Sequence, residues 1–265
     1  MLLTEIEKSQ LIETEPDSNK WIRPLISAHE FLHNKTRYCL WLLNITPNEL
    51  KRLPNILERV EQVKRTRLKS TRAATVDLAQ FPTKFGFISH KENNYVLIPR
   101  HSSENRKYIP IGFFDENSIA SDSCLFISNA KLYDFGVLMS SIHMVWVKNM
   151  CGRIKSDYRY SNDLVYNNYP WPAYPSEKQI KAIETAAQNV LDARSEFPNS
   201  SLADLYNPLT MPPVLVKAHN DLDKAVDLAY RPQAFTSEAN RMVFLFELYE
   251  KYTANLFTKE KVKKK

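Results

Sequence analysis

The sequence has 265 residues, of which 43% are hydrophobic and 25% charged, and its formal net charge is +6. These values are ordinary for a globular protein and exclude a disordered, collagen-like or low-complexity chain. Only 4 glycines occur and they are widely separated, which excludes the glycine-rich loops that cradle nucleotide phosphates. Because no apolar run reaches the roughly 18 residues of a membrane span and the N-terminus is acidic, we expect a cytoplasmic protein.

Positive charge is concentrated in the middle of the chain. Residues 1–20 carry 2 basic against 5 acidic side chains, residues 21–172 carry 21 against 13, and residues 173–265 carry 13 against 12. Such a basic block is typical of a domain that binds a polyanion, although a solvated surface produces the same imbalance. The acidic segment 1–20, which contains Pro16-Asp17-Ser18-Asn19, is expected to be a tether that precedes a globular domain beginning at Trp21.

A basic helix is predicted early in this domain, after a short buried strand over residues 38–43. Thr46-Pro47-Asn48-Glu49 combines a capping box with proline at the first helical position, and the helical pattern restarts at Pro54 and continues to about Gln80. Its basic residues either face phosphates or are simply solvated, and the sequence leaves both readings open. The candidates for phosphate contacts on this helix are Lys64, Arg65 and Arg67.

Strands and a packed helix are predicted next. Apolar runs over residues 95–99, 108–114 and 124–127 indicate a small mixed or antiparallel sheet, and helical spacing over 135–150 indicates a helix that packs on it and ends at Gly152. His143 within that helix is interpreted as core filler. Cys39, Cys124 and Cys151 are widely spaced and lie among apolar neighbours, so they are predicted to be buried free thiols. No residue spacing typical of a zinc site is present, so no metal site is expected.

The amino-acid composition changes from residue 169, where prolines and aromatic residues alternate. Tyr169-Pro170-Trp171-Pro172-Ala173-Tyr174-Pro175 cannot continue a helix or a central strand, so it is interpreted as a linker or rigid corner. A capping box at Ser176 opens a helix to about Glu196, and further helices are expected over 213–230 and 237–257. The predicted fold is therefore α+β: a sheet domain with packed helices over residues 21–172, followed by an all-helical domain over residues 173–265.

No catalytic motif is found. The sequence contains no nucleophile elbow, no paired-carboxylate motif and no Asn-Pro-Pro-aromatic signature of amino-group methyltransferases. An enzyme with an unfamiliar site remains an alternative, but the chain is expected to bind rather than react.

The segment Lys155-Ser156-Asp157-Tyr158-Arg159-Tyr160-Ser161 is the most suggestive local feature. If it is extended, its side chains alternate and Lys155, Asp157 and Arg159 form a comb of charges on one face. Lysine and arginine donate hydrogen bonds to guanine, and aspartate accepts one from cytosine, so this comb is able to read bases in a major groove. The alternative is a solvent-facing strand with compensating charges.

Several blocks in order resemble the C-terminal third of the MmeI-like family of restriction-modification enzymes and adenine-N6 DNA methyltransferases. They are Tyr108-Ile109-Pro110-Ile111-Gly112-Phe113, Ser156-Asp157-Tyr158-Arg159-Tyr160-Ser161, Val165-Tyr166-Asn167-Asn168-Tyr169-Pro170-Trp171-Pro172, and Ala218-His219 with Leu222-Asp223-Lys224-Ala225-Val226-Asp227. The resemblance implies a target recognition domain for double-stranded DNA, followed by a C-terminal helical domain. It also implies that the methyltransferase domain, with its S-adenosylmethionine, lies upstream, so this chain itself is expected to hold no cofactor.

The resemblance further implies which residues read bases. Three pairs are expected, namely Arg100 with Asp122, Ser123 with Arg159, and Lys155 with Asp157. Arg153 joins the helix residues above as a candidate for phosphate contact. The competing hypothesis is a protein-interaction domain, or an enzyme with an unrecognised site, whose basic block only solvates its surface.

Overall fold

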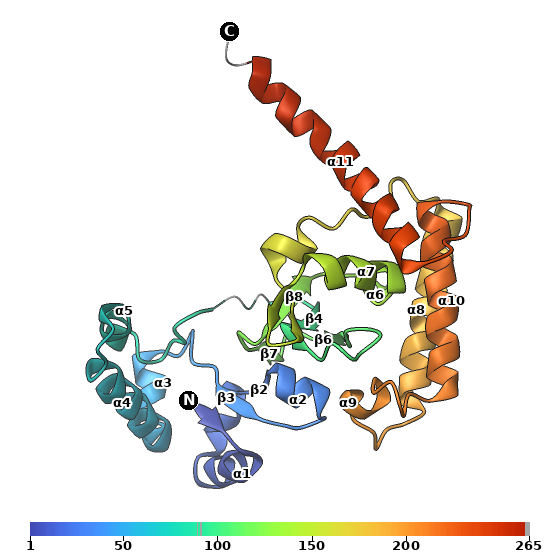
Figure 1. Cartoon of the computed structure of the whole chain (residues 1–265). Coiled ribbons are helices and arrows are strands. Elements are labelled where there is room, and N and C mark those ends of the chain that lie inside the picture. Colours follow the sequence, from blue (N-terminus) through green and yellow to red (C-terminus); the bar gives the residue numbers. More distant parts are fainter. Residues whose placement is uncertain (89, 91, 263–265) are drawn as a thin grey trace.

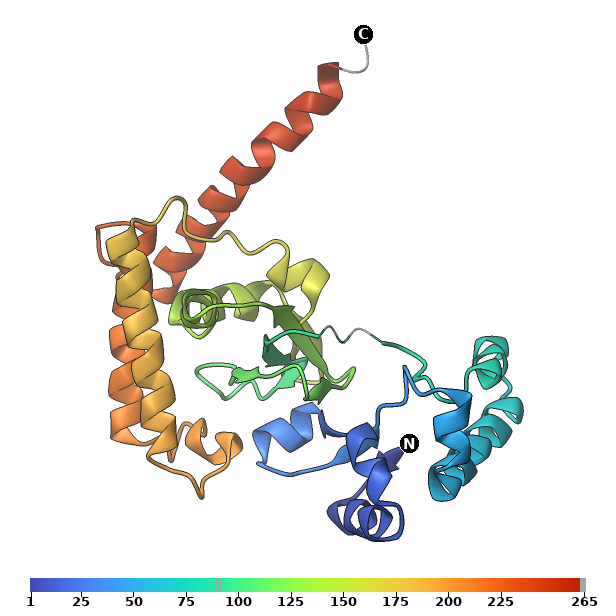
Figure 2. The same cartoon turned by 180° about the vertical axis from the view of Figure 1, so that it is seen from behind.

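The computed structural model describes residues 1–88, 90 and 92–262, and its side chains are described as far as residue 254. Three small sheets occupy the centre of the molecule, with a lobe of short helices on one side and a bundle of long helices on the other (Figures 1 and 2). The last helix, α11, projects away from the body. This arrangement confirms the α+β fold with a helical C-terminal region.

The first sheet corrects the expectation of a tether over residues 1–20. Leu2–Leu3 form β1, which pairs with β3, and Thr4 closes a capping box with Glu7 at the start of α1. Leu3 and Leu11 are buried against Leu40, so this segment belongs to a hydrophobic core. The strand order is β1-β3-β2-β7, with β1 (Leu2–Leu3), β2 (Ile22–Ile26), β3 (Tyr38–Leu40) and β7 (Ile119–Ala120). The helices that accompany this sheet are α1 (Glu5–Thr14), η1 (Pro16–Trp21) and α2 (Ala28–Leu32).

The basic helix is interrupted, where the sequence predicted one helix from Pro54 to Gln80. The expected capping box at Thr46 is confirmed. The break falls in the polar stretch after Leu68, where the Ser70 hydroxyl accepts a hydrogen bond from the amide of Arg72. Such local bonds compete with the helical ladder. The lobe consists of α3 (Pro47–Lys51), α4 (Pro54–Leu68), α5 (Ala73–Asp77) and η2 (Leu78–Gln80).

Two three-stranded antiparallel sheets follow, in the orders β6-β4-β8 and β5-β10-β9. The run over residues 108–114 is a strand only from Gly112, because Pro110 offers no backbone donor and Tyr108 is held by a side-chain contact instead. The strands are β4 (Tyr95–Pro99), β5 (His101–Ser102), β6 (Gly112–Phe114), β8 (Cys124–Ser128), β9 (Gly152–Ile154) and β10 (Asp157–Arg159).

The helix expected over residues 135–150 is two helices, α6 (Leu132–Leu138) and α7 (Ser141–Met150). Ser140 separates them, because its hydroxyl accepts a hydrogen bond from the amide of His143 and caps α7. His143 is buried, as its assignment to the core predicted. Gly152 does not cap this helix; it begins β9.

The C-terminal helices agree with the sequence pattern, including the capping box at Ser176. The helical domain was expected to extend to residue 265, and residues 263–265 lie outside the described part of the chain. Cys39, Cys124 and Cys151 are free thiols, and the first two are buried while the third is half-buried. The remaining helices are η3 (Asn162–Tyr166), α8 (Glu177–Ser195), α9 (Leu202–Leu205), α10 (Pro213–Tyr230) and α11 (Glu238–Val262).

One buried core extends from the sheet β6-β4-β8 into α8 and α10. A polar network lies inside it. The Tyr108 hydroxyl donates to Asp223 Oδ2 at 2.7 Å, and the amide of Ser141 donates to Asp223 Oδ1 at 2.7 Å. The Tyr108 ring also stacks on His219, with ring centroids 4.0 Å apart. The segment before β6 is therefore fixed to α10 by a buried hydrogen bond and a ring stack.

Candidate nucleic-acid interface

Three chain segments meet at Arg100, which follows β4. The amide of Arg100 donates to the carbonyl of Ser123 at 3.0 Å, and the amide of Tyr160 donates to the carbonyl of Arg100 at 2.8 Å. The backbone of Arg100 thus lies between the start of β8 and the end of β10. This arrangement gathers Arg100, Asp122, Ser123 and Arg159 at one edge of the two small sheets.

The side chain of Arg100 contacts its expected partner through the backbone. Arg100 Nε donates to the carbonyl oxygen of Asp122 at 2.6 Å. This bond orients the guanidinium, and its terminal nitrogens have no hydrogen-bond partner among the described residues. The exposed Asp122 carboxylate is likewise available to a ligand. The pair can therefore present donors and acceptors together, as reading a base pair requires.

Ser123 and Arg159 come from the two segments that bond to the backbone of Arg100, and the described residues show no hydrogen bond between their side chains. Ser123 Oγ accepts a hydrogen bond from the amide of Ala28 at 3.0 Å and lies 2.8 Å from Ser121 Oγ, so it is partly committed to the fold. Arg159 is exposed, while its neighbours Tyr158 and Tyr160 are buried. The alternation expected for this strand is thus present at residues 158–160.

The predicted comb is wrong at Lys155. Residues 155–161 are not one extended strand, because β9 and β10 form a hairpin and Lys155 lies in its turn with φ of 55°. Asp157 and Arg159 still share a face of β10. Asp157 Oδ1 accepts a hydrogen bond from the amide of Glu104 at 3.2 Å, which orients the carboxylate and leaves Oδ2 for a ligand. The side chain of Lys155 therefore projects from the hairpin turn and not from the strand.

His101 and Glu104 also border this site, although neither is among the residues predicted from the sequence. His101 is exposed on β5 and pairs in register with Arg159. Its position directly after Arg100 is the one signal in the sequence that points to it. The amide of Glu104 acts on Asp157 through the backbone, and no side-chain pattern reveals such a contact.

The four candidates for phosphate contact differ in whether their side chains already bond to other parts of the protein. Lys64 and Arg65 are exposed, and within the described part of the chain neither has a hydrogen-bond or ion-pair partner. Arg67 instead donates to the carbonyls of Leu78, Phe81 and Lys84 at 2.6–2.9 Å. Its guanidinium holds the segment after α5 against α4.

Arg153 is also engaged by the protein. It donates to the carbonyl of Ser156 at 2.7 Å, and its guanidinium lies 4.1 Å from the centre of the Tyr158 ring. These contacts brace the β9-β10 hairpin. Lys64 and Arg65 are therefore the better candidates for phosphate contacts.

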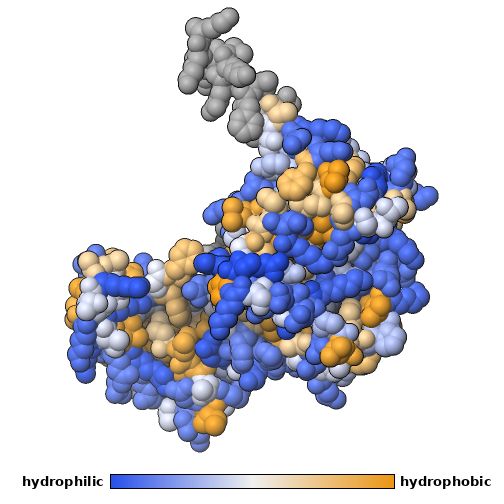
Figure 3. All heavy atoms as spheres, viewed as in Figure 1, coloured by the Kyte–Doolittle hydropathy of each residue, from blue (hydrophilic) through white to orange (hydrophobic). Residues whose placement is uncertain are grey.

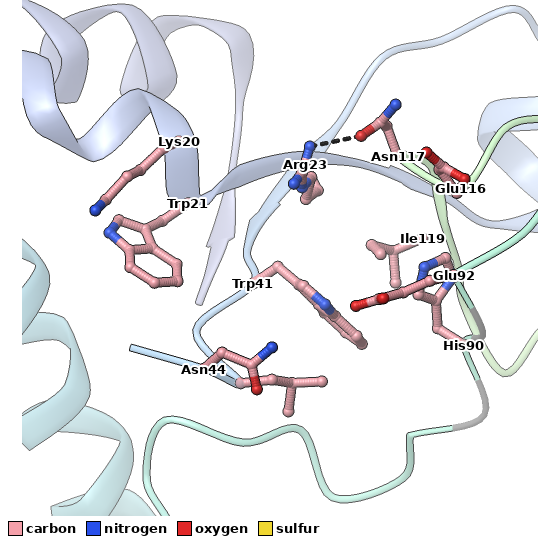
Figure 4. Close-up of a pocket in the computed structure, with 11 residues that line it drawn as sticks. Lys20, Trp21, Arg23, Trp41, Asn44, His90, Glu92, Glu116, Asn117 and Ile119 are labelled. Carbon is pink, nitrogen blue, oxygen red and sulfur yellow. Dashed lines mark hydrogen bonds between the residues drawn. The ribbon is translucent and has the colours of Figure 1, made fainter. Parts of the chain in front are cut away.

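A separate hollow of about 340 Å³ lies beside Trp41 (Figure 4). Its cations already have partners: Lys20 Nζ lies 2.7 Å from Glu49 Oε1, and Arg23 donates to Asn117 at 2.8 Å. The Lys20 contact and the bonds from Thr46 lower the pKa of Glu49 to about 2. Two carboxylates line the hollow itself, Glu92 and Glu116. We therefore assign it no phosphate contact.

Neither a metal cluster nor a membrane helix is found where the structure is described. Within residues 1–88, 90 and 92–262, no three His, Cys, Asp or Glu side chains are grouped so that they could hold a metal ion. None of the helices in these ranges is both long and apolar enough to cross a membrane.

The chain is similar to known proteins along nearly its whole length. The family model described as the MmeI target recognition domain matches residues 1–173, and the model of the MmeI C-terminal domain matches residues 175–257. DNA methyltransferase A of Bacillus subtilis (strain 168) is 41% identical over 254 residues, which are 96% of this chain and 29% of that protein.

A solved structure of the Type IIL restriction-modification enzyme MmeI in complex with DNA matches with a TM-score of 0.91 at 47% sequence identity. The match covers 96% of this chain and 34% of the other. The chain thus spans about a third of the length of the relatives it matches.

Proposed function

The chain belongs to the MmeI family, as a target recognition domain followed by a C-terminal domain, and we propose that it recognises a specific sequence in double-stranded DNA. The relative of 47% identity is a restriction-modification enzyme solved with DNA. The observation that carries the proposal is the meeting of three segments at Arg100. It places side chains with donors and acceptors at one edge of the sheets, which is the chemistry of base reading.

We further propose that base reading is shared by three sets of residues. Arg100 with Asp122 forms the first set, Ser123 and Arg159 flank it, and Lys155 with Asp157 forms the third at the hairpin. The orienting bonds to the carbonyl of Asp122 and from the amide of Glu104 support this assignment. A side chain fixed before binding loses less conformational entropy on contact with a base.

The reaction served by this recognition belongs to the rest of the polypeptide. Because a relative of 41% identity is a DNA methyltransferase, we propose that the parent protein methylates adenine N6 with S-adenosylmethionine held in an upstream domain. Cleavage of DNA by the same parent is a second candidate activity, which the relative MmeI suggests. In either case the present chain supplies the recognition and not the chemistry.

Replacing Lys64 and Arg65 together by alanine is expected to weaken DNA binding about equally on all sequences. Both side chains are exposed and have no described partner, so their loss leaves the fold intact. Log affinity falls with log salt with a slope of about −0.9 per phosphate contact, so loss of two contacts should make the slope about 1.8 less steep. Electrophoretic mobility shifts at several salt concentrations measure both effects.

The matched control replaces Lys178 and Lys181, two exposed lysines of α8, by alanine. It removes the same charge from the helical region and should leave the slope unchanged. An equal loss in both double variants would mean that net charge, and not the face of α4, sets the affinity. Arg67 is left out of the experiment because its guanidinium holds the loop after α5.

Exchanging the charges at the hairpin is expected to change the preferred base pair at one position. Lys155 can donate to guanine while Asp157 accepts from the paired cytosine, so Lys155→Glu with Asp157→Arg should favour C·G over G·C there. A good pair discriminates by about 1–3 kcal/mol, or about 5- to 150-fold in affinity. Selection of bound duplexes from a randomised library, followed by sequencing, measures the preference.

Two variants serve as controls for this exchange. Ser156 lies between the two residues in the sequence, and Ser156→Ala should leave the base preference at every position unchanged. Asp157→Asn keeps an oxygen that can accept from the amide of Glu104, so it separates base reading from support of the loop. A preference that stays the same in the exchanged variant, or that changes at all positions, argues against these residues as base readers.

A further inference from the structure

The segment between η2 and β4 is firmly anchored at its start. Arg67 of α4 donates three hydrogen bonds to carbonyls of residues 78, 81 and 84. The next aromatic ring, Phe85, stacks on Trp41 with centroids 5.6 Å apart and planes inclined by 27°. Figure 1 shows this segment crossing from the lobe of α4 and α5 to the central strands. Arg67 and Trp41 therefore fix the position of the chain directly before Gly86.

Two large apolar side chains stand exposed immediately after this anchor. Phe87 is 73% exposed and Ile88 is 38% exposed. Apolar surface of this size on an anchored segment marks a contact surface, since the free protein gains nothing from exposing it. In Figure 3 apolar residues gather in the hollow between the lobe and the centre of the molecule.

Phe87 and Ile88 share a groove with two of the proposed base-reading residues. One groove of about 520 Å³ is lined both by Phe87, Ile88 and Trp41 and by Asp122 and Ser123. The exposed ring and the expected base readers therefore border one continuous surface. A duplex read by Asp122 and Ser123 would place its neighbouring base pairs along the groove, within reach of Phe87.

The charge around the groove favours DNA as the partner. Arg37 lines the groove and is ion-paired with Glu30 at 3.2 Å, while the unpaired cations Lys64 and Arg65 lie on α4, the helix that anchors the segment. A base stack offers apolar faces flanked by phosphates, which suits an exposed ring on a segment that a basic helix anchors.

We propose that Phe87, supported by Ile88, inserts between neighbouring base pairs beside the recognised sequence and opens that step of the duplex. The inference rests on the proposed recognition of DNA and adds to it a deformation of the helix. Insertion of apolar side chains partly unstacks a base step and bends the duplex, so the ease of opening that step would itself contribute to sequence preference.

The experiment compares Phe87→Ala with Phe81→Ala in the 265-residue chain. Phe81 is a matched control, because it is 52% exposed on the same segment but does not line the groove. The probe is a duplex selected by the unmodified chain from a randomised library. Phe87→Ala should bind it about 10-fold more weakly, in line with the loss of one stacking contact, while Phe81→Ala should bind within about twofold of the unmodified chain.

Two further measurements report insertion itself. Single mismatches placed along the probe open one base step in advance, so at one position a mismatch should restore most of the affinity lost by Phe87→Ala. A 2-aminopurine at that step should brighten on binding of the unmodified chain and of Phe87→Leu, and not on binding of Phe87→Ala.

Each remaining outcome contradicts the proposal in a distinct way. If the unmodified chain selects no duplex, recognition of DNA fails and the insertion fails with it. If the unmodified chain binds but Phe87→Ala binds equally well, the insertion alone is wrong. In that case the exposed ring is left as a surface for another part of the polypeptide.

Discussion

Asp223→Ala is expected to lower the free energy of unfolding by about 2–5 kcal/mol, because it leaves two buried donors without acceptors. Those donors are the hydroxyl of Tyr108 and the amide of Ser141, which Asp223 receives on separate carboxylate oxygens at 2.7 Å. Asp223 itself is 9% exposed. Urea denaturation followed by circular dichroism measures the change.

Asp221→Ala is the matched control, since it removes an exposed carboxylate from the same helix. Asp221 only makes surface ion pairs with Lys217 and Lys224, and such pairs contribute about 0–1 kcal/mol. Asp223→Asn should fall between the two because it keeps one accepting oxygen. If Asp223→Ala and Asp221→Ala were equally stable, the buried network would not hold α10 to the segment before β6.

Acidification is expected to destabilise the protein between about pH 6.5 and pH 4, through two buried histidines. Burial lowers the pKa of His143 from its usual value to about 4, and burial likewise lowers the pKa of His219. A histidine whose pKa is lowered by folding binds fewer protons in the folded state, so its contribution to stability is complete above pH 6.5 and is lost as the pH falls. For His143 the loss is about 3 kcal/mol.

The contacts of His143 show why the charged form is disfavoured. Its Nδ1 lies 2.7 Å from the carbonyl oxygen of Leu138, and its Nε2 lies 3.0 Å from the hydroxyl of Tyr160. Among the described residues that act on the pKa of His143, none is a carboxylate that could balance a positive charge. The neutral ring is therefore the form that the core accommodates.

The free energy of unfolding, measured at half-unit steps of pH, tests this expectation. His143→Gln cannot titrate in this range and should flatten the curve. The exposed His101 offers a control, since His101→Gln should leave the dependence on pH as it is. A curve for His143→Gln as steep as that of the unmodified protein would assign the acid sensitivity to other groups.

Helix boundaries with a capping signal were predictable from the sequence. The boxes at Thr46 and Ser176 begin helices as expected, because a side-chain hydroxyl and a nearby glutamate or glutamine satisfy the first amides. The same signal is present at Thr4 and Glu7, where it outweighs the acidic composition that predicted a tether. The break at Ser140 could not be foreseen, because the apolar pattern continues across it.

The candidate site was predictable in part. Composition and spacing indicated charged residues near position 157, and the family resemblance supplied the pairing of Arg100 with Asp122. The hairpin at Lys155 was missed because a left-handed backbone at a lysine has no signal in the sequence. Likewise, nothing local reveals that Arg67 binds three distant carbonyls, since those contacts depend on how the chain returns to α4.

The backbone around Arg100 has a consequence for how such proteins diversify. Its amide and carbonyl are both held by neighbouring segments, so the position of residue 100 does not depend on its own side chain. Arg159 is similar, with buried tyrosines on either side of an outward-facing side chain. If Arg100 and Arg159 read bases as proposed, substitutions at these two positions change the bases that are recognised and leave the backbone that presents them unchanged. On that proposal, related proteins with this backbone arrangement can acquire new target sequences by single substitutions that do not destabilise the fold.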